Sequence, residues 1–151
     1  MAFVSKPNVT TNFLPDQGLN KSWIMKKLPV AASVAIAEGA AVYWQGSGAG
    51  TVTKVTNATA NFAGILAETI AATDTDYATA GKLKAVWVPT NTSAEAFFTV
   101  GAGTFTAADV GESVKFYDEV SVDADTGGTQ VRITGYISST KGKCIFNQAI
   151  S

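Results

Sequence analysis

The sequence predicts an all-β fold, a small antiparallel barrel or sandwich that follows an extended N-terminal arm. Two observations predict this fold class. Hydrophobic residues make up 46% of the 151 residues and charged residues 15%, with abundant Val, Thr and Gly, a composition that suits strands and tight turns. Short apolar or alternating segments also recur between turn residues, with almost no helical periodicity. This pattern is typical of barrels and sandwiches.

Residues 1–29 differ from the remainder of the chain and are predicted to form the arm. Pro7, Pro15 and Pro29 interrupt any helix, and turn-forming residues are common between them. Burying the large apolar side chains of this segment yields on the order of 8–15 kcal/mol. Fixing its backbone costs about 1–2 kcal/mol per residue, which is more in total. We therefore expect the arm to acquire its order from the body or from a partner.

Residues 30–151 are predicted to form the body, a series of short strands joined by turns. The one segment with helical character is Thr106–Asp109, where a Thr cap is followed three residues later by an acid and Gly111 ends the turn. The predicted strands are 34–36, 41–44, 51–56, 62–67, 83–88, 96–100, 114–117, 120–122, 130–137 and 143–147.

An internal repeat is also predicted, with the same order of strands in both copies. The paired segments are 39–44 with 111–117, 61–67 with 132–138, and the Gly-Lys turns at 81–82 with 142–143. The first two pairs are offset by 72 and 71 residues and the third by 61, so the first copy must contain a longer loop, expected at residues 71–80. Chance similarity in a chain rich in Gly, Thr and Val is the alternative interpretation.

No combination of residues predicts catalysis, a cofactor or a metal site. The chain has no histidine, which excludes Ser-His and Cys-His nucleophile pairs and removes the commonest zinc ligand. Asp74 with Asp76 and Asp123 with Asp125 each place two acids two residues apart. A calcium loop or an acid-base pair is possible there, but the remaining ligands of an EF-hand loop are missing, so solvated turns are the preferred interpretation. We expect a protein that is not an enzyme.

Charge is unevenly distributed along the chain. Residues 1–54 carry a net charge of +3 and residues 55–151 a net charge of −4. This difference in charge either has no functional role or indicates a basic arm that contacts an acidic partner. Lys26 and Lys27 beside Trp23 form a small basic-aromatic cluster, but the slightly acidic total charge argues against nucleic-acid binding.

The sequence shows neither an apolar run long enough to span a membrane nor the pattern of a secretion signal. Its single cysteine, Cys144, cannot form an internal disulfide and fits a reducing compartment. Because Cys144 lies within an apolar strand, we expect it to fill space in the core or near the surface. No membrane partner is predicted.

Three segments resemble those of the small capsid decoration, or cement, proteins of tailed bacteriophages. They are the strand pair entered through Gly39 or Gly111, the segment Phe62-Ala-Gly-Ile-Leu66, and the turn Phe105-Thr-Ala-Ala-Asp-Val-Gly111. The resemblance covers residues 36–150 and concerns short, general patterns. It implies a β-barrel or β-tulip-like body on the capsid exterior of a virion assembled in the host cytoplasm. Each copy would stabilise the shell by bridging neighbouring capsomers, with several modest contacts acting together.

The resemblance also implies the partners, which are the major capsid protein and further copies of this chain in a small closed oligomer such as a trimer. The arm could add a strand to an exposed sheet edge of the shell. We expect the contacts to be made by Phe3, Phe13, Leu14, Trp23 and Ile24, with Lys6, Lys21, Lys26 and Lys27 steering the approach. For Trp23 and Ile24, the alternative is that they begin the first strand of the body.

Two other functions remain open at this stage. One is a tail-tube, fibre or other structural subunit of a virion, which would polymerise. The other is a soluble carbohydrate- or peptide-binding β-module that uses an aromatic platform of Tyr43, Trp44, Tyr77 and Trp87. Deletion of residues 2–20 is expected to leave the body folded and to abolish binding to shells.

Overall fold

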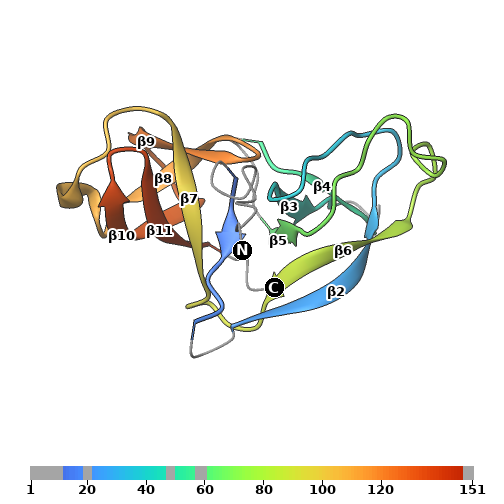
Figure 1. Cartoon of the computed structure of the whole chain (residues 1–151), viewed down its shortest axis with the longest axis horizontal. Coiled ribbons are helices and arrows are strands. Elements are labelled where there is room, and N and C mark those ends of the chain that lie inside the picture. Colours follow the sequence, from blue (N-terminus) through green and yellow to red (C-terminus); the bar gives the residue numbers. More distant parts are fainter. Residues whose placement is uncertain (1–11, 19–21, 47–49, 57–60, 148–151) are drawn as a thin grey trace, which may run out of the picture.

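The computed structural model describes residues 12–18, 22–46, 50–56 and 61–147. Over these ranges the protein is all-β, with eleven strands and one short 3-10 turn, as the sequence predicts. The strands form two units that lie side by side, with β2 to β6 on the right of Figure 1 and β7 to β11 on the left. The predicted body is therefore built from two small barrels.

The first barrel contains five strands in the order β2-β4-β3-β5-β6 and is closed by pairing of β2 with β6. Its strands are β2 (Trp23–Val30), β3 (Ala41–Trp44), β4 (Val52–Lys54), β5 (Phe62–Leu66) and β6 (Lys82–Pro89). All neighbours are antiparallel except β2 and β4, which meet in parallel through Val30 and Val52.

The second barrel is a six-stranded sheet in the order β1-β7-β11-β10-β8-β9, in which β7 also pairs with β9. This extra pairing joins β7, β11, β10, β8 and β9 into a ring, with β1 added to the outside of β7. The elements are β1 (Leu14–Pro15), β7 (Glu95–Ala102), η2 (Ala107–Asp109), β8 (Ser113–Asp118), β9 (Ser121–Gly127), β10 (Val131–Ser138) and β11 (Lys141–Phe146).

The two barrels have the same topology. If β2 to β6 are renamed β7 to β11 in order, every pairing of the first barrel becomes a pairing of the second. The parallel pair agrees in detail, because Val30 meets Val52 in one barrel and Val100 meets Val122 in the other. The strand order of the predicted repeat is therefore confirmed.

The residue alignment of the repeat needs a correction. In the first barrel the Gly39 N–H donates to the Leu66 carbonyl, and in the second the Gly111 N–H donates to the Ile133 carbonyl, each at 2.8 Å. Leu66 is thus the counterpart of Ile133. The sequence pairing matched Leu66 with Ile137, so that pairing is shifted by four residues. The pairing relied on two glycines that have different environments. A Cβ on Gly64 would collide with the Trp87 carbonyl, whereas one on Gly135 would only touch the Lys143 side chain at 3.4 Å.

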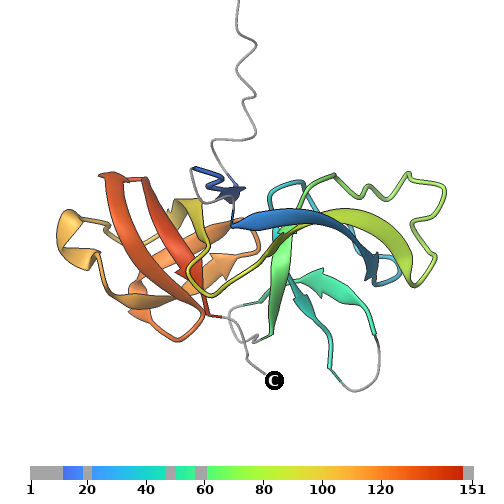
Figure 2. The same ribbon diagram turned by 90° about the horizontal axis from the view of Figure 1, so that it is seen from below.

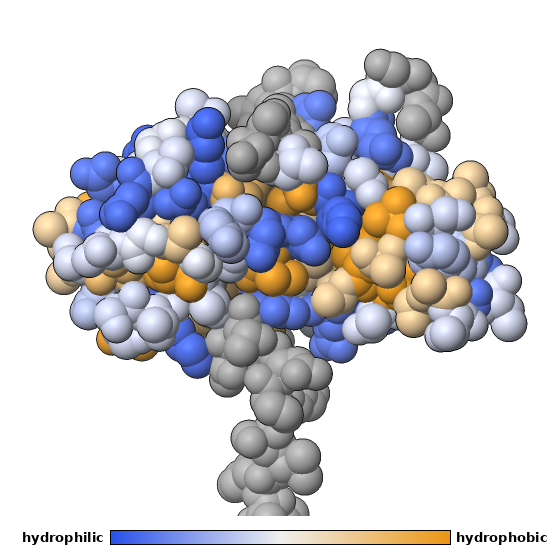
Figure 3. Space-filling model, turned by 90° about the horizontal axis from the view of Figure 1, so that it is seen from above, coloured by the Kyte–Doolittle hydropathy of each residue, from blue (hydrophilic) through white to orange (hydrophobic). Residues whose placement is uncertain are grey.

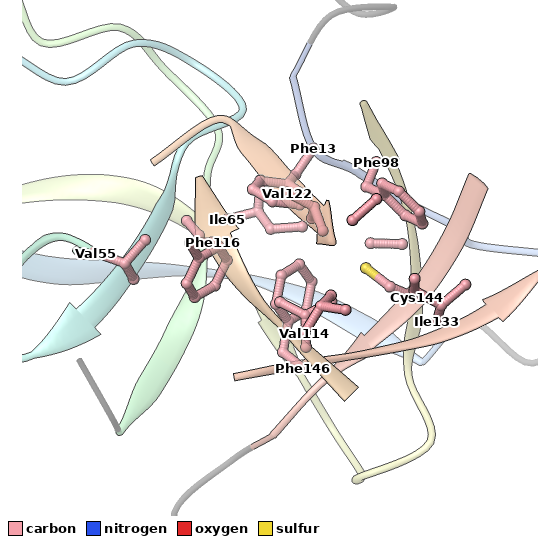
Figure 4. Close-up of a cluster of buried hydrophobic side chains, with 14 of the residues drawn as sticks. Phe13, Val55, Ile65, Phe98, Val114, Phe116, Val122, Ile133, Cys144 and Phe146 are labelled. Carbon is pink, nitrogen blue, oxygen red and sulfur yellow. The ribbon is translucent and has the colours of Figure 1, made fainter. Parts of the chain in front are cut away.

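Two hydrophobic cores hold the molecule together, and the larger one is shared between the barrels. The smaller core lies within the first barrel, around Val42, Leu66 and Val86. The larger core fills the second barrel and extends to side chains of the N-terminal half (Figure 4). The residues that the N-terminal half contributes to it are Phe13, Trp23, Ala41, Val55 and Ile65.

Phe146, at the end of β11, is the aromatic centre of this shared core. Its ring stacks on Phe62 with 4.1 Å between centroids and meets Phe13 and Trp23 edge-on at 5.1 and 6.2 Å. Offset and edge-on pairs of this kind add about 0.5–1.5 kcal/mol each beyond the area they bury. The two barrels are therefore joined by packing as well as by the chain.

The predicted boundary between arm and body, after residue 29, is wrong. Residues 23–30 form β2 and pair with β6 along eight consecutive positions. Pro29 was taken as a breaker, but it lies on a strand that has an open edge, where a missing N–H costs nothing. A separate arm can therefore include only residues that precede the described segment 12–18.

Candidate assembly surface

Residues 12–17, here called the N-terminal strap, cross the junction between the two barrels. On the first barrel, the Asn12 side chain donates to the Glu38 carbonyl at 2.6 Å and the Phe13 N–H donates to the Gly39 carbonyl at 3.0 Å. The Phe13 ring is 2% exposed within the shared core. The strap is therefore an integral part of the fold.

The same strap is fixed to the second barrel through β1. Leu14 and Pro15 pair with β7, and the Asp16 N–H donates to the Glu95 carbonyl at 2.9 Å. The Asp16 carboxylate lies 2.8 Å from the Lys143 ammonium. This hydrogen-bonded ion pair lowers the pKa of Asp16 and raises the pKa of Lys143, while burial acts in the opposite direction on both groups.

The structure separates the predicted contact residues into three groups. Phe13 and Trp23 are each 2% exposed, so the prediction that they contact a partner is wrong. Leu14 and Ile24 are 37% and 42% exposed, and Lys26 and Lys27 are also exposed, so these four remain accessible. The remaining three, Phe3, Lys6 and Lys21, lie outside the described residues.

The outer edge of β2 is the feature that sequence reasoning missed. Figures 1 and 2 show β2 and β6 as a long curved ribbon that runs from the junction into the first barrel, with β2 on the outside. From Ile24 to Lys27, four consecutive residues of β2 are exposed. Between Ile24 and Pro29, no strand of the described chain pairs with the side of β2 that faces away from β6. Lys26 and Lys27 were predicted as contact residues, but nothing in the sequence showed that they lie on the edge of a strand.

Exposed apolar side chains on the rest of the surface do not form one patch. On the face in Figure 3, hydrophobic residues lie in the middle and over the first barrel, and the second barrel is more hydrophilic. Apart from Ile24 and Met25 of β2, the exposed large apolar residues of the described ranges are spread over both barrels and are Leu14, Trp44, Leu83, Val110, Tyr117, Tyr136 and Ile137.

The paired carboxylates take part in local structure. Asp74 accepts the Ala71 N–H and Asp76 forms an ion pair with Lys84 at 2.9 Å. Asp123 accepts the Thr126 hydroxyl and Asp125 accepts the Thr104 N–H. The structure brings together no cluster of three or more metal-ligating side chains over the ranges it describes.

The other candidates for chemistry are also packing residues. Cys144 is fully buried in the shared core, as expected for a core filler, and burial raises the pKa of its thiol. Tyr43 and Trp87 pack against the shared core, whereas Tyr77 packs against the core of the first barrel, where its ring lies below the Lys82 ammonium. Of the four, only Trp44 is exposed, at 38%. The predicted aromatic platform is thus divided between two cores.

No protein-family model matches the chain, and no curated protein matches it. Within the described ranges, no helix has the length and apolar character needed to cross a bilayer.

Proposed function

We propose that this protein is a non-enzymatic structural protein of a virion. In this proposal it is a capsid decoration protein that binds the outside of a phage head and stabilises the shell by bridging capsomers. Its partners are the major capsid protein and other copies of itself. The proposal joins the resemblance of the sequence to such proteins with the architecture of the strap and the two barrels.

The N-terminal strap is the observation that carries the proposal. Contacts with Gly39 and Glu95 fix it to both barrels at once, so the strap connects the two barrels at their junction. The sequence before the strap includes Phe3 and Lys6, two of the predicted contacts. In this proposal residues 2–11, here called the tether, bind the shell, and the strap joins them to both barrels.

The duplicated body gives independent support. Two barrels of equal topology can each contact one of two neighbouring copies of a repeated partner. A shell presents such repeated neighbours, and several weak contacts on one rigid body combine into strong binding.

The test is binding to shells assembled without this protein. We expect the full chain to bind them and raise their melting temperature. Deletion of residues 2–11 is expected to weaken binding by at least about tenfold, since it removes the tether and keeps the strap. The earlier expectation for deletion of residues 2–20 no longer holds, because that deletion removes Phe13 from the core.

Circular dichroism and thermal unfolding of the deletion variant provide the control, and both should match the full chain. Failure of the full chain to bind shells contradicts the proposal. Unchanged binding of the deletion variant contradicts the role of the tether.

A tail-tube or fibre subunit is the second candidate, because a body of two barrels with the same topology can pair repeatedly with the barrels of further copies. Sedimentation of the purified chain separates the two functions. A decoration protein stays a monomer or a small closed oligomer, whereas a tube subunit polymerises.

A further inference from the structure

The backbone of β2 alternates in direction, and its odd-numbered residues face the open edge. At Trp23 both the N–H and the carbonyl bond the side-chain amide of Gln17, and at Ala31 the N–H donates to the Val52 carbonyl. In contrast, the carbonyl of Ser22 accepts from Thr90, which continues the ladder toward β6. By this alternation, Met25 and Lys27 present their backbone groups outward.

This open edge is short and bounded at both ends. Gln17 occupies its beginning, the parallel pair with β4 closes its end, and Pro29 has no N–H to donate. Met25 is 48% exposed and the Lys27 side chain 64%. An extended segment of about five residues fits this length, because only every second residue of an antiparallel neighbour forms hydrogen bonds with the edge.

The charges beside the edge decide which segment fits. Lys26 and Lys27 project from opposite faces of β2, and Lys26 has no ion pair with any described residue. Lys27 lies 3.6 Å from Glu68, but both side chains are exposed, so this pair contributes little. Two cations on the two faces favour a neighbouring strand that carries carboxylates.

A second copy of this chain does not satisfy the same edge. Antiparallel pairing of β2 with β2 would bring lysines close to lysines, which is destabilising, and lysine and proline on edge strands are known to prevent self-association. The residues that precede the strap carry Lys6 and no acidic residue, so they also lack the complementary charge.

We propose that the edge of β2 between Ile24 and Pro29 is a docking site for an extended acidic segment of a partner protein, which adds as a strand beside β2. The inference rests on the proposed function, in which the partner is the shell subunit. Backbone bonds to Met25 and Lys27 supply affinity, and the two lysines select carboxylates on the incoming strand.

The first experiment compares Met25→Pro with Met25→Ala in binding to shells assembled without this protein. Proline removes the outward N–H and leaves the ladder to β6 intact, whereas alanine shortens the side chain and keeps the N–H. We expect Met25→Pro to bind at least about tenfold more weakly than Met25→Ala. Thermal unfolding of both variants verifies that they are folded.

The second experiment tests the charges. The double variant Lys26→Glu with Lys27→Glu is expected to bind about tenfold or more weakly at low salt, with a smaller loss at high salt. Arg132→Glu is the matched control for the single variant Lys26→Glu, since each reverses one exposed base and Arg132 lies on β10 of the other barrel. We expect the control to bind as the unaltered chain does.

The outcomes separate the two proposals. If the unaltered chain ignores shells, the proposed function fails and the docking site fails with it. If the chain binds and Met25→Pro equals Met25→Ala, the docking site is wrong and the decoration function stands. If the charge variant loses binding and Met25→Pro does not, the contact is made through side-chain charge, as with a nucleic acid. That result would also overturn the addition of a strand beside β2. Dimerisation that Met25→Pro abolishes would identify a second copy as the occupant and overturn the inference.

Discussion

Phe13 illustrates how one residue outside the barrels' strands can stabilise both of them. Its ring is 2% exposed and meets Phe116 and Phe146 edge-on at 5.8 and 5.1 Å. Replacing it by alanine leaves a cavity in the shared core, so we expect Phe13→Ala to lower the free energy of unfolding by about 3–5 kcal/mol. Urea denaturation followed by tryptophan fluorescence measures this loss.

Leu14, the next residue, is the control for this prediction. It is 37% exposed, so Leu14→Ala should cost far less. Equal losses for the two variants would show that the strap does not insert into the core.

At the scale of single residues, the sequence identifies apolar candidates for partner contact but does not show whether their side chains point into the core or toward solvent. Phe13, Leu14, Trp23 and Ile24 have the same apolar character, and all four were predicted to contact a partner. Phe13, which precedes β1, and Trp23, which begins β2, are buried, whereas their neighbours Leu14 and Ile24 are exposed. That alternation could be predicted only for a segment already known to be a strand.

At the scale of elements, the two repeats provide a matched pair of glycines. Gly39 and Gly111 both have positive φ, 87° and 97°, and both begin the turn into the next strand. A Cβ at Gly111 meets nothing within 4 Å, whereas a Cβ at Gly39 lies 2.5 Å from the Asn12 Cβ and 3.1 Å from the Phe13 carbonyl oxygen. We expect Gly111→Ala to cost about 1–2 kcal/mol of backbone strain.

Gly39→Ala should destabilise more, because it adds a collision with the strap to the same strain. Comparison of the two unfolding midpoints in urea measures the difference. Equal destabilisation would contradict the position of the strap against Gly39.

Most elements could be predicted because their signals are local. β3 has the predicted bounds, the expected Thr106 cap forms with Asp109, and the other strands after β3 lie within two residues of theirs except β9. β9 runs to Gly127, so the solvated turn expected at Asp123 and Asp125 is wrong, and both residues lie in the strand. The predicted strand 34–36 is instead an isolated bridge from Ile36 to Ile70. β2 was missed because its exposed middle and Pro29 hide the pattern of a strand. Only its pairing with β6, which is distant in sequence, makes it one.

At the scale of the whole molecule, the shared core predicts one unfolding transition. Each barrel has its own sheet, yet the larger core takes Trp23 and Ile65 from the first half and Val114 and Phe146 from the second. Neither half can lose its structure without exposing apolar surface on the other. Differential scanning calorimetry should therefore give a calorimetric enthalpy equal to the van't Hoff enthalpy.

Two separate transitions would show that the barrels are independent domains. The sequence could not decide this question, because the repeat predicts two similar units but says nothing about their contact. The contact depends on aromatic side chains such as Phe62 and Phe146, which lie in strands of different copies.

The position of Phe146 also has a consequence during synthesis on the ribosome. The first barrel has left the exit tunnel long before β11, the last strand, has been translated. Until then Phe13, Trp23 and Phe62 lack the ring against which they pack. A nascent chain that is released before residue 146 therefore exposes aromatic side chains that are buried in the complete fold. We expect such truncated chains to aggregate or to be degraded.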